Sequence, residues 1–364
     1  MTERNLQIVV MSNAKELGSL VYEKIKKKEN FEKEHLINIE PIRFANGEGK
    51  VKLKESVRGG DVFILCDIGN YGMTYDFFDG KHSMSPDEHF ADLKRVILAI
   101  RGNTKRITVG MPLLPFSRQH KRNGRESLDC AWALQELKNM GVHNIFTFDV
   151  HDPNVQNAIP TTPFDNFPPT KSLLKTFVRK ENIDFENTLM LSPDEGAMGR
   201  TRFTAGMLGL DIGLFYKRRD YSKIEKGKNP VAEHMYLGKR QDNLNYIIPD
   251  DMIASGGSVL DILKQLTNMK PKEVYIMASF SFFTEGTDKF EEAFESGLLS
   301  KVYSTNLSYI PKEIKNKPWF ECVDCSGLIA EAILAYHYNK PLSPLLNSRK
   351  ELYKSIQKII TSKQ

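Results

Sequence analysis

Short apolar runs alternate with amphipathic stretches along most of the chain, and this alternation restricts the fold more than any other feature. The runs at residues 6–12, 61–68 and 106–114 are rich in Val, Ile and Leu, and each is followed by a stretch typical of a helix. The same order resumes after residue 187. Strands that alternate with helices form parallel sheets with helices packed on their faces. The sequence therefore predicts an α/β protein with two parallel sheets.

The length of the chain, 364 residues with 40% hydrophobic residues, is sufficient for two domains with full cores. Four prolines at residues 159–172 mark a domain boundary better than any other stretch. We predict an N-terminal α/β domain at 1–163, a C-terminal α/β domain at 164–340 and a C-terminal helix at 341–364. That last segment has apolar residues at helical spacing, which are Leu352, Ile356, Ile359 and Ile360.

Charge and composition narrow the class of partner. The net charge of +5 is mild, which is compatible with polyphosphate substrates and gives no reason to expect nucleic acid. No apolar run approaches the roughly 18 residues of a membrane span, and the N-terminus lacks the apolar core of a signal peptide. The four cysteines are too few and too scattered for a disulfide scaffold. We therefore expect a cytoplasmic protein that spans no membrane.

The stretch "YIIPDDMIASGGSVLDILKQL", residues 246–266, places two carboxylates, then small residues and glycines, between a strand and a helix. Glycine leaves backbone N–H groups uncovered, and a helix N-terminus attracts anions, so the turn at 255–258 suits a phosphate. Asp250 and Asp251 would repel that phosphate unless they bind a cation or sugar hydroxyls. A sugar phosphate with Mg²⁺ satisfies both requirements. An ordinary turn, with Ser255 capping the helix and both aspartates solvated, also fits these residues.

Polar residues follow several other predicted strands, where ligands of parallel α/β sheets usually bind. They are Asn46, Glu48, Arg118, Gln119, His151, Asp194 and the run Lys217 to Arg219. His151 has Asp149 two residues before it, on the same face if the strand continues, so both side chains would reach one cation. A hydrogen-bonded structural histidine is the alternative at that position. The sequence contains no Walker-type loop and no GxGxxG, so nucleotide binding by those routes is not indicated.

Six segments, taken together and in order, resemble the ribose-phosphate pyrophosphokinase family, also called phosphoribosyl pyrophosphate synthetases. The likeness runs from about residue 5 to residue 346. The segments are "RFANGEGKVKLKESVRGGDVFI" (43–64), "SRQHKR" (117–122), "DVHDPNVQ" (149–156), "SPDEGAMGR" (192–200), "KRR" (217–219) and "DDMIASGGS" (250–258). The resemblance implies two similar three-layer phosphoribosyltransferase-like domains, each a parallel sheet between helices.

The resemblance also implies an activity. Family members transfer the β,γ-diphosphoryl group of ATP to the C1 hydroxyl of ribose 5-phosphate, giving phosphoribosyl pyrophosphate and AMP for nucleotide biosynthesis. ATP and ribose 5-phosphate would be the substrates and Mg²⁺ the cofactor. Family members assemble as dimers that build hexamers, with ATP sites completed by a neighbouring chain, so a homo-oligomer is expected.

The same resemblance implies roles for individual residues. ATP would be bound by Phe44, Asn46, Gly47, Glu48, Arg118 and Gln119. Mg²⁺ would be positioned by His151 and Asp194. Lys217 and Arg219 would be catalytic, at the end of a strand that leads into a loop at 220–239, and this loop would close over the reacting phosphates. Ribose 5-phosphate would be bound by Asp250, Asp251, Ser255, Gly256, Gly257 and Ser258.

The sequence departs from the family pattern at several places. Ala254 replaces an acidic residue before the glycine turn, Asn46 and His120 also replace acidic residues, and Pro249 lies in the strand before the aspartates. The connection at 67–90 is longer than usual, and its aromatic residues fit an extended ATP pocket, a subunit contact or a surface flap; they are Tyr71, Tyr75, Phe77 and Phe78.

Three alternative functions are compatible with these residues. The first is the same transfer to a larger ribose 5-phosphate derivative, suggested by Ala254 and the long connection. The second is a non-catalytic regulatory subunit of a synthetase. The third is a type I phosphoribosyltransferase, which consumes phosphoribosyl pyrophosphate.

Overall fold

The computed structural model describes residues 5–29, 35–78, 80–219, 231–238, 242–346 and 349–363, apart from the side chains of 217–219 and 231–234. The chain divides into two compact units. Unit 1 comprises Met1–Pro169, Asn306–Pro311 and Asp324–Asn347, and unit 2 comprises Thr170–Thr305, Lys312–Val323 and Ser348–Gln364. Unit 1 thus includes two segments, 306–311 and 324–347, that follow most of unit 2 in the sequence. The domain boundaries predicted after residues 163 and 340 stay predictions.

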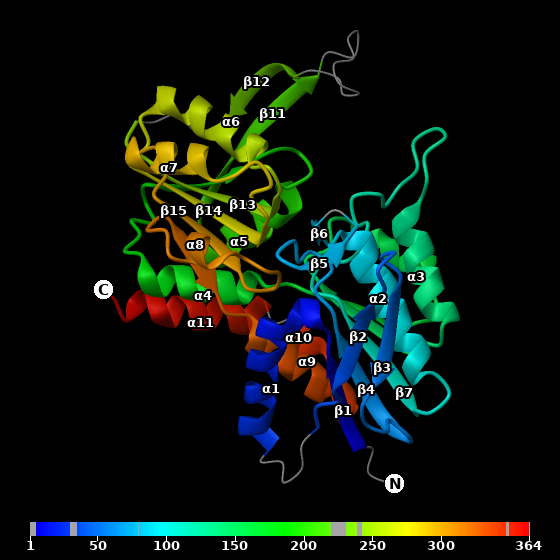
Figure 1. Ribbon diagram of the computed structural model, residues 1–364. Helices are drawn as coiled ribbons and strands as arrows, with labels where there is room; N and C mark the ends of the chain where they lie inside the picture. The colour runs from blue at the N-terminus through cyan, green and yellow to red at the C-terminus, as the bar shows by residue number, and fades with distance from the viewer. Residues whose placement is uncertain are drawn as a thin grey trace. The chain divides into compact units, whose positions relative to one another are not determined.

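A five-stranded parallel sheet forms the centre of unit 1, in the order β1-β4-β7-β8-β9. The strands are β1 (Asn5–Val10), β4 (Gly60–Leu65), β7 (Arg106–Gly110), β8 (Asn144–Phe148) and β9 (Phe164–Phe167). The helices are η1 (Ser12–Ala14), α1 (Lys15–Glu29), α2 (Pro86–Ile100), α3 (Asp129–Asn139), η2 (Pro153–Ala158), α9 (Ser326–His337) and α10 (Ser343–Leu346). Helices α2 and α3 cover one face of the sheet, and α1 packs beside α9 on the other (Figure 1).

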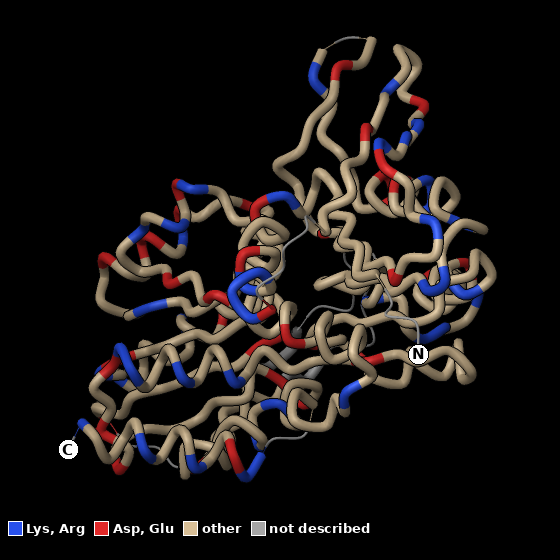
Figure 2. The backbone as a smooth tube through the Cα atoms, turned by 90° about the horizontal axis from the view of Figure 1, so that it is seen from below, with Lys and Arg blue, Asp and Glu red and all other residues tan. Residues whose placement is uncertain are grey.

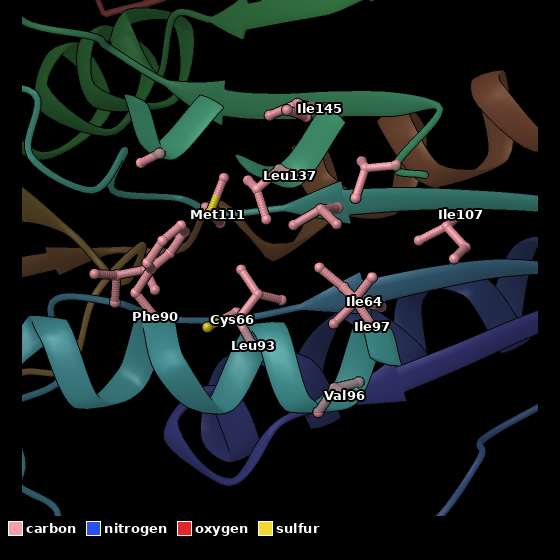
Figure 3. Packing of buried hydrophobic residues seen from close by; sticks show 14 of the residues in the cluster. Ile64, Cys66, Phe90, Leu93, Val96, Ile97, Ile107, Met111, Leu137 and Ile145 are labelled. Atoms are coloured by element: carbon pink, nitrogen blue, oxygen red, sulfur yellow. The ribbon is translucent and has the colours of Figure 1, made fainter. Parts of the chain in front are cut away.

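The core between α2, α3 and the sheet follows from the spacing of apolar residues. Phe90, Leu93 and Ile97 recur at intervals of three and four residues, so they form one buried face of α2. They pack on alternate residues of the strands, such as Ile64 in β4 and Ile107 in β7 (Figure 3). Burying each such side chain contributes about 1.5–3 kcal/mol. This core fixes the position of α2, which supports two of the predicted nucleotide-binding segments.

Two antiparallel hairpins are inserted into the βα alternation of unit 1. Strands β2 (Ile39–Arg43) and β3 (Gly49–Leu53) form the first, and β5 (Thr74–Phe77) and β6 (Gly80–Ser83) form the second. The second hairpin lies in the long connection at 67–90. The alternation of strands and helices does not predict either of them.

A seven-stranded sheet forms the centre of unit 2, in the order β12-β11-β10-β13-β14-β15-β16. The strands are β10 (Thr188–Ser192), β11 (Asp211–Arg219), β12 (Val231–Leu237), β13 (Asn245–Ile253), β14 (Glu273–Ser281), β15 (Lys301–Thr305) and β16 (Phe320–Val323). All neighbouring pairs are parallel except β11 and β12. Residues 231–237, predicted as part of a loop, are therefore a strand, and that prediction was wrong because these residues pair with β11.

Helices cover both faces of the sheet in unit 2 (Figure 1). They are α4 (Thr170–Lys180), α5 (Met198–Leu208), α6 (Gly257–Leu266), η3 (Thr267–Met269), α7 (Asp288–Glu295), α8 (Lys312–Lys315) and α11 (Arg349–Thr361). Helix α11 packs beside α4 and α5, where Leu352 and Ile356 are buried and Ile359 and Ile360 are partly buried. An amphipathic C-terminal helix is confirmed at Arg349–Thr361, and the predicted bounds of 341–364 stay a prediction. The predicted α/β class, with two three-layer arrangements of a sheet between helices, is confirmed as well.

Charged residues of both signs are interspersed along the described chain (Figure 2). An anion site in this protein would therefore depend on local groups more than on a region of one charge. Within the residues that the structure describes, no helix combines the length and the apolar character needed to cross a bilayer.

Candidate active site

The predicted nucleotide loop, residues 44–48, is the turn that joins β2 to β3. Phe44 donates its backbone N–H to the carbonyl of Glu48, and Gly47 donates to the carbonyl of Phe44, both at 2.9 Å. Gly47 has φ +85°, a conformation that glycine adopts without strain. The side chain of Asn46 bonds to Glu48 twice, through the backbone N–H at 3.2 Å and the carboxylate at 3.0 Å. The turn is thus closed by its own bonds while Phe44, Asn46 and Glu48 remain exposed to a ligand.

Arg118 and Gln119 lie in the loop that follows β7, and both side chains are exposed. A strained residue shapes this loop, because Phe116 has φ +57° and its carbonyl accepts a 2.8 Å hydrogen bond from the Gln119 N–H. The Phe116 ring packs edge-on against Phe90 of α2, with ring centroids 5.8 Å apart. Helix α2 therefore supports the loop that carries the predicted phosphate-binding arginine.

His151 follows β8 and is exposed. The strand ends at Phe148, and Asp149 has φ +43°, so Asp149 and His151 do not share one face of a strand. That expectation was wrong because the strand ends before Asp149 and the chain turns at that residue. The His151 ring instead lies 5.3 Å from the ring of His120, which pairs with Asp152 at 3.5 Å. The structure thus brings His151 beside the loop of Arg118 and Gln119.

Asp250 and Asp251 lie within β13 in unit 2, close to its carboxyl end. The strand contains Pro249, although proline lacks the N–H that a central strand needs. Pairing with β10 ends at Ile247, while pairing with β14 continues to Ile253. The Asn245 N–H points toward the β10 side, and the strand alternation puts the Pro249 nitrogen on that same side, beyond the last paired residue. No ladder bond is lost, so the proline is compatible with this strand.

The two aspartates interact directly. Asp250 is half-buried, Asp251 is buried, and the Asp251 N–H donates to the Asp250 carboxylate at 2.8 Å. Burial and the charge of Asp251 raise the pKa of Asp250 well above its usual value of 3.8, and Arg200 opposes this effect. Two carboxylates held this close favour binding of hydroxyl groups or a cation, because either ligand offsets their repulsion.

Replacing Asp250 with asparagine should therefore stabilise the ligand-free protein at high pH. An acid whose native pKa is raised costs stability once it ionises, so this cost appears as pH rises from 3.8 through the native pKa. We expect Asp250→Asn to raise the midpoint of thermal unfolding at about pH 8.5 and to change it little at about pH 4. Thermal unfolding followed by circular dichroism checks this. An equal shift at both pH values would contradict the electrostatic explanation.

The predicted phosphate loop runs from Ser255 to Ser258 and leads into α6. Gly256 is the residue before the helix, with φ +85°, and the Gly257 N–H donates to the Ser255 hydroxyl at 3.4 Å. A Cβ at Gly256 would lie 2.5 Å from the Phe290 ring, so only glycine fits there. Backbone bonds from Phe282 and Thr284 hold the preceding residues at 2.8 and 2.9 Å. The first N–H groups of a helix have no partner within it, which suits a phosphate.

Asp194 lies just after β10, and its side chain is exposed. Its Oδ1 accepts a 2.9 Å hydrogen bond from the Ala197 N–H, and its carbonyl accepts one from the Ser192 hydroxyl at 2.8 Å. These bonds orient the carboxylate at the carboxyl end of the sheet. Within the described residues, no group of three or more His, Cys, Asp or Glu side chains could by itself hold a metal ion.

Lys217 and Arg219 belong to the end of β11, and their side chains lie outside the described part of the structure. Pairing with β10 ends at Leu214, whereas pairing with β12 continues to Arg219. The end of β11 is therefore a two-stranded ribbon. The predicted closing loop falls partly on residues 220–230 and 239, which are also outside the described residues.

The predicted residues form two groups, one in each unit. Unit 1 holds the nucleotide loop, the Arg118 loop and His151, and unit 2 holds Asp194, β11, the aspartates and the phosphate loop. Sequence reasoning missed the residues that support the nucleotide loop, among them Arg43 and Asp92, which form an ion pair at 2.5 Å. Their positions, 49 residues apart, carry no local signal.

Two parallel sheets between helices, with strand-end aspartates before a glycine-capped helix, define a phosphoribosyltransferase-like α/β protein.

Comparisons with known proteins narrow this class. Residues 6–141 match the N-terminal domain of ribose phosphate pyrophosphokinase. A ribose-phosphate pyrophosphokinase of Ralstonia nicotianae is 30% identical over 237 residues, which is 64% of this chain and 67% of the relative. One from Mycoplasma pneumoniae is 28% identical over 83% of this chain and 85% of the relative. The chain therefore belongs to the ribose-phosphate pyrophosphokinase family, a family of enzymes.

A solved structure agrees with the observed fold. The crystal structure of phosphoribosylpyrophosphate synthetase from Mycobacterium smegmatis matches 92% of this chain and 100% of its own chain, with a TM-score of 0.73 and 24% sequence identity. The predicted phosphoribosyltransferase-like fold is thus confirmed.

Proposed function

We propose that this enzyme transfers the β,γ-diphosphoryl group of ATP to the C1 hydroxyl of ribose 5-phosphate, forming phosphoribosyl pyrophosphate and AMP. The observation that carries the proposal is the paired aspartates of β13, followed by the glycine-capped start of α6, in a chain of this family. The aspartates accept hydrogen bonds from sugar hydroxyls, and the helix start holds a phosphate. A sugar phosphate is therefore the ligand that fits unit 2.

ATP binding is assigned to unit 1. Phe44 is 49% exposed and offers an aromatic ring to an adenine, and Asn46 and Glu48 offer polar groups to a nucleoside. Arg118 is exposed and carries a positive charge for the triphosphate, with Gln119 beside it. Gly47 adopts the positive φ that this turn requires, which a residue with a side chain rarely does. These six residues, Phe44, Asn46, Gly47, Glu48, Arg118 and Gln119, are the proposed ATP site.

By the resemblance to the family, Mg²⁺ would be positioned by His151 and Asp194, and each of these side chains is exposed in its own unit. The carboxylate of Asp194 is a hard oxygen ligand, while the imidazole of His151 is less suited to direct contact and would act through water. Mg²⁺ commonly binds one or two protein groups together with substrate phosphates, so a larger cluster of acidic residues is not required. When bound, Mg²⁺ withdraws charge from the phosphate that is attacked.

Lys217 and Arg219 are the proposed catalytic residues. Diphosphoryl transfer needs two anionic substrates to be aligned and the charge of the transferred group to be neutralised. Cationic side chains at the end of a two-stranded ribbon supply positive charge without covalent chemistry. We also propose, from the resemblance to the family, a cytoplasmic homo-oligomer built from dimers.

The acceptor is tested by measuring AMP release from ATP and Mg²⁺ with purified protein. Ribose 5-phosphate, ADP-ribose and a sample without acceptor are compared, and products are identified by mass. We expect AMP and phosphoribosyl pyrophosphate with ribose 5-phosphate, despite Ala254. AMP with ADP-ribose alone would move the substrate to a larger derivative. If no AMP is released with either acceptor, the proposed activity is overturned and a regulatory subunit is favoured.

A further inference from the structure

The long connection at 67–90 is fixed at both of its ends within unit 1. At its start, the carboxylate of Asp67 accepts hydrogen bonds from the Ser308 hydroxyl at 2.9 Å and from the Tyr309 N–H at 2.8 Å. At its end, Ser85 and Glu88 form a capping box at the start of α2. A segment tied down in this way has a defined place on the unit, unlike a loose flap.

The hairpin in this connection contacts the nucleotide loop directly. A Cβ on Gly47 would lie 2.8 Å from Cε2 of Phe77 and 3.5 Å from the hydroxyl of Tyr75, so both rings sit against the backbone of the turn. Phe77 packs edge-on against Tyr75, with ring centroids 6.1 Å apart. These two side chains therefore lie against the turn at Gly47.

A second set of contacts joins the hairpin, the nucleotide loop and α2. The guanidinium of Arg43 lies 5.1 Å from the centre of the Tyr75 ring and donates to the Gly47 carbonyl at 3.3 Å. Asp92 of α2 pairs with Arg43 at 2.5 Å. The Tyr75 hydroxyl donates to Glu88 at 2.7 Å. Tyr75 is thus held between the helix and the arginine that supports the turn.

These contacts act on the backbone of the turn, while the side chains proposed to touch the nucleotide remain exposed. A loop held in its binding conformation before the ligand arrives loses less conformational entropy on binding, and its affinity is higher. We propose that Tyr75 and Phe77 are positioning residues that hold the 44–48 turn and thereby set the affinity for the nucleoside triphosphate. This inference rests on the proposed ATP site.

The test compares Phe77→Ala with Lys81→Ala in the full-length protein. Lys81 lies on the same hairpin in an exposed ion pair with Asp76, so its variant controls for changes in the hairpin alone. We expect Phe77→Ala to raise Kd and KM for ATP about fivefold or more. Its kcat and its KM for ribose 5-phosphate should stay within about twofold of wild type. Should Phe77→Ala fail to fold, Phe77→Leu keeps apolar volume and removes the ring.

Kd for ATP is measured by titration calorimetry, so the result does not depend on turnover. An unchanged Kd in a folded variant would overturn the inference, as would an equal rise of both KM values or the same loss in Lys81→Ala. Failure of the proposed function has a different signature, because wild-type protein would then release no AMP with ribose 5-phosphate. The comparison of Kd values would still decide the role of Phe77.

Discussion

Replacing Lys217 with alanine should lower kcat by about 100- to 1000-fold, the range measured when one charge-stabilising donor is removed from an active site. KM for ATP and for ribose 5-phosphate should change far less, because we assign Lys217 to the charge of the transferred group and not to ground-state binding. Steady-state kinetics with each substrate varied in turn checks this.

The matched control for Lys217→Ala is Met235→Ala. Met235 lies on β12 opposite Tyr216, and its side chain is 43% exposed, so its loss perturbs the ribbon without removing a charge. A similar loss of kcat in both variants would assign the effect to the ribbon. An unchanged kcat in Lys217→Ala would remove this lysine from the mechanism.

Replacing Gly256 with alanine should raise KM for ribose 5-phosphate about tenfold or more and lower the stability of unit 2. The φ of +85° is unfavourable for alanine by roughly 1–2 kcal/mol. The added methyl group would also lie 2.5 Å from the ring of Phe290, which is fully buried in the core. Both effects displace the N–H groups that we assign to the phosphate. Kinetics and thermal unfolding measure the two consequences separately.

Gly257→Ala is the matched control for this substitution. Among the described residues, a Cβ at Gly257 would meet only the Ser255 hydroxyl at 3.6 Å, an ordinary contact, and the φ of Gly257 lies outside the left-handed region. We expect nearly wild-type stability and a smaller change in KM from this variant. Equal effects at the two glycines would mean that the side chain itself, and not the displaced turn, blocks the ligand.

Much of the fold follows from local sequence patterns. The apolar runs at β4 and β7 and the helical spacing of Phe90, Leu93 and Ile97 are sufficient to predict a parallel sheet covered by helices. The extent of β13 was harder to predict, because Pro249 argues against a central strand until the pairing with β10 is known to end before it. The left-handed turn at Asp149 likewise carried no signal in the sequence.

The candidate site also has features that the sequence predicts and features that only the tertiary structure shows. The sequence by itself determined the family and the order of strands and helices. It also identified Gly256 and the paired aspartates as candidate site residues, because turns and helix starts depend on residues close in the chain. Only the tertiary structure decided that Tyr75 and Phe77 lie against Gly47, and that Arg43 pairs with Asp92 of α2. These contacts join residues about 30 to 50 positions apart, and such pairs are fixed by how the hairpins and helices pack and not by any local preference.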